Sequence, residues 1–384
     1  MQGKGNITIF FDGFQEIHLL KDPFLVPYYL GKALNHNVTL LYPRLPDNGN
    51  LPNTYRNVQL IPLELIERRH YSIRKKYSNV IDYVVKHASE IDVLMLFFGD
   101  YLSEILTKEY KKNNPRGKVY IKLDINPYGI RAKFWEFPFD WTINNILRSK
   151  FFSLADVASC ETQLAYDKIK SGRIRHRKFG SKLVLAPNGV DEEEIQTMGL
   201  GNPDYSQKEN IMLTVARLGT YEKNTEMLLD AIGKLKLREW KFYLIGPVDE
   251  NFKRKKELFM SEHPDLAEKI IWTGPIIDRH KLYGLLNKSK VFVLTSRFES
   301  YGLVLIEAQR FGNYLISTPV GAAQDVINNT YGQIVPNGDS NQLAATLQDI
   351  IDNNARIDDA YSNFDYTQLS WEKRLEKVIE RLRQ

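Results

Sequence analysis

Two glutamates, Glu299 and Glu307, stand eight residues apart on either side of Gly302, where the pattern predicts the start of a helix. An apolar run ending at Leu294 predicts a buried strand that leads into this segment. The first N–H groups of a helix lack internal partners and attract phosphate, whereas ionised carboxylates accept hydrogen bonds from hydroxyls. The segment therefore predicts a ligand with hydroxyls on both sides of a phosphate, the order of groups in a nucleotide sugar. Taken alone, Glu299 is equally well interpreted as an acid near a helix dipole, and Glu307 as a residue on a solvated face.

Two cations are expected to serve the same site. Arg217 follows a predicted strand at 211–215, and Lys223 stands just before a helix expected from Thr225. Breaking the bond between sugar and phosphate leaves negative charge on the diphosphate, which the site has to neutralise. The chain contains no Asp-x-Asp pair and no histidines at a chelating spacing. We therefore expect Arg217 and Lys223 to replace a metal, and we expect no cofactor, although such a pair in isolation is more often a surface feature.

Short apolar strands alternate with helical patterns along the whole chain. Strands are expected at 7–11, 38–42, 58–61, 93–97, 119–123, 156–159, 183–186, 211–215, 242–245, 270–273, 291–294, 314–317 and 333–335. Helices of the first half are expected at 24–34, 63–86, 102–113, 140–148 and 162–170. The alternation predicts an α/β protein with two Rossmann-like domains built on parallel sheets. Ligands of such folds bind beyond the carboxyl ends of the strands, so we expect the two domains to face each other across a cleft that holds the site.

These motifs together resemble glycosyltransferase family 4, whose members are retaining enzymes of GT-B fold. The residues that carry the resemblance are Arg217-Leu218 with Lys223, the two glutamates within 296–308, and the segments 187–191 and 332–339. Trp371 also fits the resemblance, because it opens a last helix that in GT-B enzymes crosses back to the first domain. The resemblance is strong over residues 183–350.

The resemblance implies a role for each of these side chains. Arg217 and Lys223 would bind the diphosphate, Glu307 the ribose, and Glu299 the hydroxyls of the donor sugar. Arg217, Lys223 and Glu299 would act in catalysis, which would retain the anomeric configuration without a metal, by front-face attack in which the leaving phosphate oxygen takes the acceptor proton. The remaining donor-binding residues would be Ser300, Tyr301, Gly302 and Leu303.

The first half offers two further candidates. Family members usually have a pair of glycines after the first strand, and this chain has Gly13 alone in the corresponding loop, which makes Gly13 a further donor-binding candidate. Many members also have a histidine near the donor sugar, at a place where this chain has Asp124. Asp124 is therefore a candidate catalytic residue that accepts a hydrogen bond from a donor or acceptor hydroxyl. An aspartate that merely forms a turn is an equally good interpretation.

The domain limits follow from the same pattern. A loop rich in Gly, Asn, Pro and Asp at 199–204 is the predicted linker. We assign residues 1–191 to an acceptor-binding domain and residues 192–364 to a nucleotide-sugar-binding domain. Residues 365–384 are expected to form the helix that returns to the first domain.

Composition places the chain among ordinary globular proteins. Of its 384 residues, 43% are hydrophobic and 26% are charged, and no run approaches the roughly 18 apolar residues of a membrane span. The beginning lacks the pattern of a secretory signal, and the single cysteine, Cys160, excludes an intrachain disulfide. We therefore expect a cytoplasmic protein, with Cys160 as a small buried side chain.

Charge is divided unevenly between the halves. Residues 1–191 contain 28 basic and 19 acidic side chains, whereas the rest contains 24 basic and 28 acidic ones. The basic clusters are Arg68, Arg69, Arg74, Lys75 and Lys76, and then Lys170, Arg173, Arg175, Arg177, Lys178 and Lys182. Beside these clusters, the aromatic run 134–141 suits an apolar acceptor groove or a peripheral contact with the inner face of a membrane. A solvated basic face and a packed aromatic helix remain alternative interpretations.

The predicted function is the transfer of a hexose from a nucleoside diphosphate sugar, a UDP- or GDP-sugar, to a saccharide or lipid-linked saccharide. Its setting would be cell-surface polysaccharide or glycolipid synthesis. An epimerase or hydrolase on the same scaffold, or a protein that binds a nucleotide sugar without transferring it, is the alternative. A nicotinamide oxidoreductase is disfavoured, because Gly-x-Gly-x-x-Gly follows none of the strands. A nucleic-acid partner is not expected, since it would rest on the basic first half alone.

Overall fold

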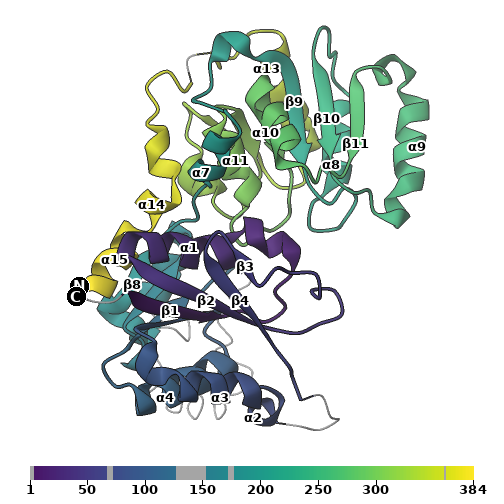
Figure 1. Cartoon of the computed structure of the whole chain (residues 1–384). Helices are drawn as coiled ribbons and strands as arrows, with labels where there is room; N and C mark the ends of the chain where they lie inside the picture. The colour runs from purple at the N-terminus through teal and green to yellow at the C-terminus, as the bar shows by residue number, and fades with distance from the viewer. Residues whose placement is uncertain (1–3, 67–71, 127–152, 172–176, 359) are drawn as a thin grey trace. The chain divides into compact units, whose positions relative to one another are not determined.

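The computed structural model describes residues 4–66, 72–126, 153–171, 177–358 and 360–384. The chain divides into two compact units (Figure 1). The first unit contains residues 1–189 and 371–384, and the second contains residues 190–370. The chain enters and leaves the second unit at neighbouring points, because the Val190 N–H donates to the Leu369 carbonyl over 2.8 Å.

The described part of the first unit is built on a sheet with the strand order β3-β4-β2-β1-β5-β6-β7-β8. All its neighbouring strands pair in parallel except β3 and β4. The strands are β1 (Gly5–Phe10), β2 (His36–Pro43), β3 (Thr54–Tyr55), β4 (Val58–Leu63), β5 (Val93–Phe97), β6 (Lys118–Lys122), β7 (Val157–Cys160) and β8 (Leu183–Leu185). The α-helices are α1 (Asp22–Leu34), α2 (Ile73–Lys76), α3 (Ser78–Lys86), α4 (Tyr101–Asn113), α6 (Gln163–Lys170), α14 (Trp371–Arg374) and α15 (Glu376–Arg383).

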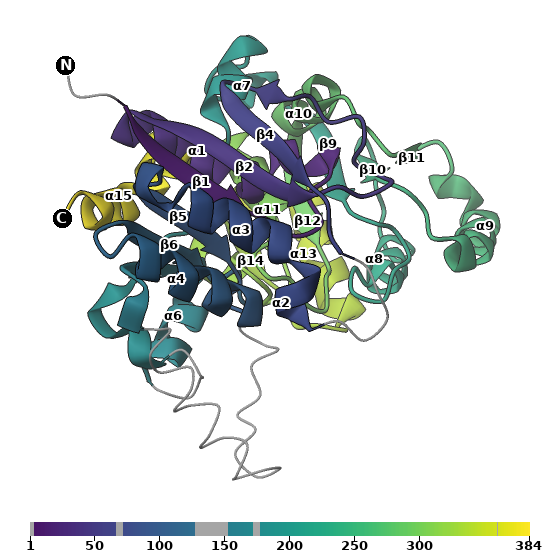
Figure 2. The same cartoon turned by 60° about the horizontal axis from the view of Figure 1, so that its bottom comes forward.

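Helices cover both faces of this sheet. Side chains alternate between the faces of a strand, so Ile9 packs in one core with α1, α14 and α15. Phe10, its neighbour in β1, packs in the other core with α3, α4 and α6. Figure 2 shows α3 and α4 lying over the strands of this unit. Cys160 is buried in the second of these cores.

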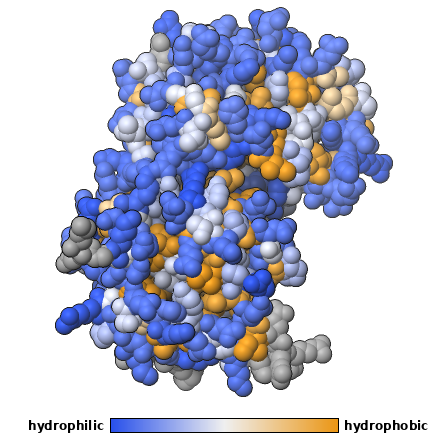
Figure 3. Space-filling model, viewed as in Figure 1, coloured by the Kyte–Doolittle hydropathy of each residue, from blue (hydrophilic) through white to orange (hydrophobic). Residues whose placement is uncertain are grey.

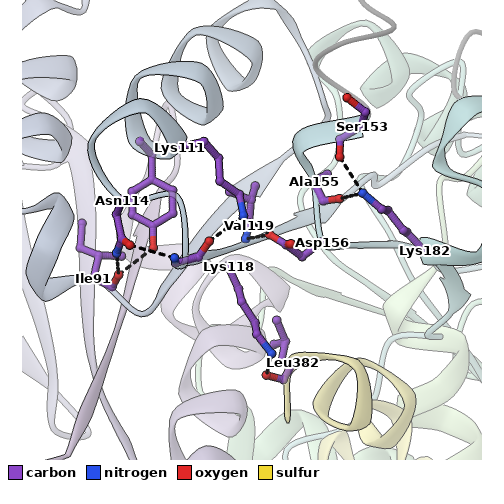
Figure 4. A network of polar contacts seen from close by, with 12 residues as sticks. Ile91, Lys111, Asn114, Lys118, Val119, Ser153, Ala155, Asp156, Lys182 and Leu382 are labelled. Atoms are coloured by element: carbon purple, nitrogen blue, oxygen red, sulfur yellow. Dashed lines mark hydrogen bonds and ion pairs between the residues drawn. The ribbon is translucent and has the colours of Figure 1, made fainter. Parts of the chain in front are cut away.

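Polar contacts connect the elements around the beginning of β6, an inner strand of this sheet (Figure 4). Asp156 accepts a hydrogen bond from the Val119 N–H at 2.7 Å and pairs with Lys111 at 2.8 Å. Lys118 donates to the Leu382 carbonyl at 2.6 Å, which ties α15 to β6. These contacts stabilise the end of the sheet at which its parallel strands begin, opposite their carboxyl ends.

The described part of the second unit has a parallel sheet with the strand order β11-β10-β9-β12-β13-β14. The strands are β9 (Glu209–Val215), β10 (Lys241–Ile245), β11 (Ile270–Gly274), β12 (Ser289–Leu294), β13 (Tyr314–Ser317) and β14 (Gly332–Ile334). The α-helices are α7 (Glu192–Thr197), α8 (Thr225–Ile232), α9 (Lys253–Glu262), α10 (Arg279–Lys288), α11 (Leu303–Arg310), α12 (Ala323–Val326) and α13 (Ser340–Ile351). Helices α8, α9 and α13 pack on one face, and α7, α10 and α11 on the other.

Two sequence predictions about the elements were wrong. The helix predicted at 63–86 does not include Leu63, which still belongs to β4 and pairs with Pro43, and the later part of this range forms two helices, α2 and α3. The predicted linker 199–204 lies inside the second unit, after α7. A polar contact binds this loop to the unit, since the guanidinium of Arg310 on α11 donates to the Gly201 carbonyl at 3.3 Å.

Several predicted features lie outside the described residues. They are the helix at 140–148, the aromatic run at 134–141 and the basic residues Arg68, Arg69, Arg173 and Arg175. The side chains of Arg177 and Lys178 are likewise not described. Hydrophilic side chains dominate the surface drawn in Figure 3, with smaller apolar groups among them. Among the helices that the structure describes, none combines the length and the apolar character needed to cross a membrane.

Candidate functional site

The loop between β12 and α11 carries the first of the two predicted glutamates. Gly302 caps the amino end of α11 with φ +85°, a left-handed conformation that a side chain disfavours. The carbonyl of Gly302 accepts the first helical hydrogen bond, from the Leu305 N–H at 2.9 Å. The amino end of α11, which by its geometry leaves its first N–H groups without partners in the helix, therefore lies directly after the loop with Glu299.

Glu299 forms an ion pair with Lys223, the cation predicted to bind diphosphate. Lys223 Nζ and Glu299 Oε1 are 2.5 Å apart, and the two side chains are 19% and 14% exposed. Ser296 Oγ also donates to Glu299 Oε1, at 2.6 Å. Because both partners are mostly shielded from water, solvent screens the attraction between their charges less than in an ordinary surface salt bridge.

Backbone contacts hold the two loops beside each other. The Arg297 N–H donates to the Glu222 carbonyl at 2.7 Å, and Thr295 Oγ1 donates to the Lys223 carbonyl at 3.2 Å. The guanidinium of Arg297 also stacks on the ring of Tyr221, 4.4 Å from its centroid. The carboxyl ends of β9 and β12, neighbours in the sheet, thus meet with their loops in contact.

Arg217, the other predicted cation, has a different partner. Its exposed guanidinium pairs with Glu222, which lies in the same loop between β9 and α8. A hydrogen bond from its own backbone N–H, together with the charge of Arg217, lowers the pKa of the Glu222 carboxyl. Arg217 and Lys223 therefore each face a carboxylate of their own.

Glu307 lies on α11 and is held by α10. Glu307 Oε1 accepts hydrogen bonds from the Arg279 guanidinium at 2.7 Å and from the Tyr283 hydroxyl at 3.1 Å. Neither donor was predicted from the sequence. The signal that was available is their spacing of four residues, which places them on one face of a helix.

The residues between the two glutamates differ in exposure. Ser300 is exposed, Leu303 is half-buried, and Tyr301 is buried with its carbonyl accepting from the Ala322 N–H at 2.8 Å. Gly321, which the sequence analysis also missed, has φ +52° and passes close to this backbone. A Cβ atom at Gly321 would lie 2.3 Å from the Tyr301 carbonyl oxygen, so only glycine fits beside the loop.

Gly13 and Asp124, the two candidates of the first half, both follow strands of the first unit. Gly13 lies in the turn after β1 with φ +74°. Asp124 follows β6, and its N–H donates to Glu161 Oε1 at 3.2 Å. Burial raises the pKa of Asp124 to about 7; the charge of Lys122 opposes this shift, while Glu161 and Asp22 add to it.

The environment of Asp124 contains a buried group of charges that the sequence analysis missed. Lys122 is almost fully buried, 2.6 Å from Glu161 and 3.0 Å from Asp22. Burial alone would lower the pKa of Lys122, but Glu161 and Asp22 outweigh it and raise the pKa well above its usual value. A lysine within the apolar run of β6 was the available signal, since a buried lysine has to be paired.

Metal-ligand clusters are missing from the part of the chain that the structure describes: no three His, Cys, Asp or Glu side chains are placed to hold an ion there. The groups gathered in the second unit are instead cations, carboxylates and a helix amino end. This set suits a ligand that combines phosphate with hydroxyl groups.

Comparison with known proteins agrees with this chemistry. Residues 202–380 match the family model described as "Glycosyl transferases group 1". The phosphatidyl-myo-inositol mannosyltransferase of Mycobacterium leprae is 28% identical over 181 residues, which are 46% of this chain and 46% of that protein. The O-antigen chain mannosyltransferase C of Escherichia coli is 25% identical over 184 residues, 46% of this chain and 47% of that one. The chain thus spans about half the length of the curated relatives it matches.

Similarity to solved structures extends over nearly the whole chain. Anabaena Alr3699/HepE, in complex with UDP and glucose, superposes with a TM-score of 0.65 at 14% identity, covering 98% of this chain and 99% of that one. This likeness shows the fold, and it confirms the predicted α/β class with two Rossmann-like domains of GT-B type.

Proposed function

We propose that this chain is a glycosyltransferase that moves a hexose from a nucleoside diphosphate sugar to a saccharide or lipid-linked saccharide. The group 1 match over residues 202–380 supports this activity. The names of the relatives, two mannosyltransferases of which one is named for phosphatidyl-myo-inositol, support a hexose donor and an acceptor in polysaccharide or glycolipid synthesis. A UDP- or GDP-sugar is the proposed donor, and the complex of the similar Anabaena protein with UDP and glucose supports such a ligand.

The observation that carries the proposal is the Lys223–Glu299 ion pair beside the amino end of α11. An ammonium group and free helix N–H groups suit phosphate, and a carboxylate suits sugar hydroxyls. When the donor binds, the diphosphate takes Lys223 as its partner, and hydroxyls of the sugar donate to Glu299. The ligand thereby gives each member of the ion pair a new partner: phosphate for the ammonium group of Lys223, and sugar hydroxyls for the carboxylate of Glu299.

The proposed reaction is retaining and independent of metal, as in glycosyltransferase family 4. The bond between the anomeric carbon and the phosphate oxygen breaks, and the electron pair stays on the diphosphate. The acceptor hydroxyl forms its bond to the same face of the anomeric carbon, and its proton passes to the leaving phosphate oxygen. Lys223, Arg217 and the amino end of α11 stabilise the charge that develops on the diphosphate.

The first unit is proposed to contribute Gly13 and Asp124. Gly13 provides a turn without a side chain, which lets a ligand approach the backbone closely. Asp124 accepts a hydrogen bond from a donor or acceptor hydroxyl when it is ionised. Since its pKa is about 7, this role is sensitive to pH near neutrality.

We also propose a cytoplasmic location with a peripheral contact at the inner face of the membrane. The support is the basic first half of the chain, together with α2, where exposed Ile73 stands next to exposed Arg74 and Lys75. Basic and apolar side chains side by side suit anionic lipid. Co-sedimentation with phosphatidylglycerol vesicles, but not with phosphatidylcholine vesicles, is the expected result.

A thermal-shift panel of UDP-, GDP- and ADP-sugars tests the central proposal. One nucleotide class should raise Tm, and its sugar should then be transferred with its anomeric configuration retained, at the same rate with and without EDTA. Free or isomerised sugar without transfer would identify an epimerase or hydrolase, and binding without any product would identify a binding protein. A panel without any shift in Tm would refute the proposed donor class.

A further inference from the structure

Arg279, the first residue of α10, lies between two carboxylates. Its guanidinium is 2.7 Å from Glu307 on α11 and 3.4 Å from Glu194 on α7. The same guanidinium stacks on the ring of Tyr283, 4.6 Å from the centroid. The side chains of Arg279, Glu194 and Glu307 are only 17%, 14% and 13% exposed. These contacts hold the side chain of Arg279 in a largely water-shielded place.

Glu307 is consequently held before any ligand arrives. Arg279 and Tyr283 stand four residues apart on α10 and therefore share one face, and both donate to Glu307 Oε1. A glutamate side chain has considerable rotamer freedom, and ordering it during binding would weaken affinity. With Glu307 already ordered by α10, a ligand does not have to bring about this ordering.

Glu194 affects the charge that Glu307 presents. One guanidinium that faces two carboxylates cannot by itself neutralise both of them, whereas it would neutralise the carboxylate of a single Arg–Glu pair. A carboxylate that keeps part of its negative charge is the better acceptor for hydroxyl donors. Glu194 is itself well placed because α7 is anchored separately, by a two-pronged pair between Glu192 and Arg310 at 2.5 and 2.9 Å.

We propose that Arg279 is a positioning residue, which together with Tyr283 and Glu194 orients Glu307 to accept hydrogen bonds from the ribose hydroxyls of the donor nucleotide. The inference rests on the proposed function in one respect only, the contact between Glu307 and ribose. It assigns Arg279 no contact with the ligand. Removal of Arg279 therefore weakens binding only of ligands that have ribose hydroxyls.

The test is isothermal titration of the full chain with UDP, GDP and ADP, and then with the 2′,3′-dideoxy form of the one that binds. Arg279→Met should weaken binding of the ribonucleotide by roughly tenfold or more and leave the dideoxy form unaffected. Tyr283→Phe removes one hydroxyl and little else, so it is the milder variant should Arg279→Met fold poorly. It should show the same selectivity with a loss of several-fold.

Arg238→Met is the control, because it breaks another Arg–carboxylate pair of the second unit, the one between Arg238 and Asp352, and touches none of α7, α10 and α11. It should leave both affinities unchanged. If Arg279→Met and Tyr283→Phe weaken both nucleotides equally, or neither, the positioning role is wrong. Glu307→Gln tests the contact between Glu307 and ribose separately from the positioning role of Arg279. If this variant still prefers the ribonucleotide, the contact is wrong, whatever the result for Arg279→Met.

Discussion

Replacing Lys223 by methionine removes the ammonium group and keeps most of the length of the side chain. In the free protein, this change leaves the Glu299 carboxylate, 14% exposed, with Ser296 as its remaining described donor at 2.6 Å. In the donor complex, it removes the cation proposed to contact the diphosphate. Both stability and nucleotide affinity are therefore expected to fall. Glu299→Gln is the partner variant, because it removes the carboxylate charge and leaves Lys223 in place.

The size of the change in Kd follows from the strength of a hydrogen bond to a charged group. A hydrogen bond to a charged group contributes about 1.5–3 kcal/mol, so Lys223→Met should raise the Kd of the nucleoside diphosphate roughly 10- to 150-fold. Glu299→Gln should act in the opposite direction on this Kd. In the free protein, Glu299 Oε1 lies 2.5 Å from Lys223 Nζ and competes with phosphate for it. Without that competition the nucleotide should bind at least as tightly as to the wild type. Turnover should fall, because the donor sugar loses the carboxylate that accepts its hydrogen bonds.

Isothermal titration with the nucleoside diphosphate and steady-state transfer kinetics separate these effects. The expected pattern is high Kd with low kcat/KM for Lys223→Met, and unchanged or lower Kd with low kcat for Glu299→Gln. The double variant should bind the nucleotide as weakly as Lys223→Met alone, since the two side chains interact directly. If Glu299→Gln weakened nucleotide binding as much as Lys223→Met does, the assignment of the cation to phosphate and of the carboxylate to sugar would be refuted.

Three further changes test the surroundings of the site. Gly321→Ala places a Cβ 2.3 Å from the Tyr301 carbonyl oxygen at φ +52°, so it should lower Tm and kcat together, measured by thermal melting and a transfer assay; normal kcat would show that the loop near Tyr301 tolerates displacement. Gly117→Ala places a Cβ 1.9 Å from the Tyr110 hydroxyl, just before β6, at the end of the first sheet opposite the carboxyl ends of its strands. It should lower Tm while the nucleotide Kd stays unchanged. The pKa of Asp124 is raised to about 7 in the folded chain, so the folded state retains a proton that the unfolded state releases, and stability should fall as pH rises from about 4 to 7. Asp124→Asn should flatten this part of the profile of Tm against pH. An identical slope in both proteins would contradict the shift.

The strands were the most predictable part of the fold. The apolar run 93–97 coincides with β5 and the run 314–317 with β13, because a buried parallel strand has to be apolar on both faces and leaves a continuous signal. The helix predicted at 63–86 failed for a related reason. The apolar spacing after Leu63 resembles a helix, and only the pairing of Leu63 with Pro43 extends β4 through this position. Periodicity along the chain contains no information about such a partner.

The site, like the fold, was predictable only in part. Glu299 and Lys223 were recognised because their types and their places after predicted strands indicate chemistry, but their direct pairing joins residues 76 positions apart and depends on β9 and β12 being neighbours. Arg279 was missed because a charged residue at a helix start resembles a solvated one. Its contact with Glu307 depends on how α10 packs against α11. Lys122 was missed similarly, since its partners Glu161 and Asp22 come from other elements.

The predicted donor-site charges of the second unit are paired within the chain. Arg217 faces Glu222, Lys223 faces Glu299, and Glu307 faces Arg279. Pairing of this kind keeps the charges from lying desolvated and uncompensated, which would destabilise the unit. It also means that donor binding exchanges ionic partners instead of adding contacts to unpaired charges. Affinity is then set by the difference between two sets of contacts, so replacing a single partner can strengthen binding as well as weaken it, and the opposite signs expected for Lys223→Met and Glu299→Gln follow from this exchange.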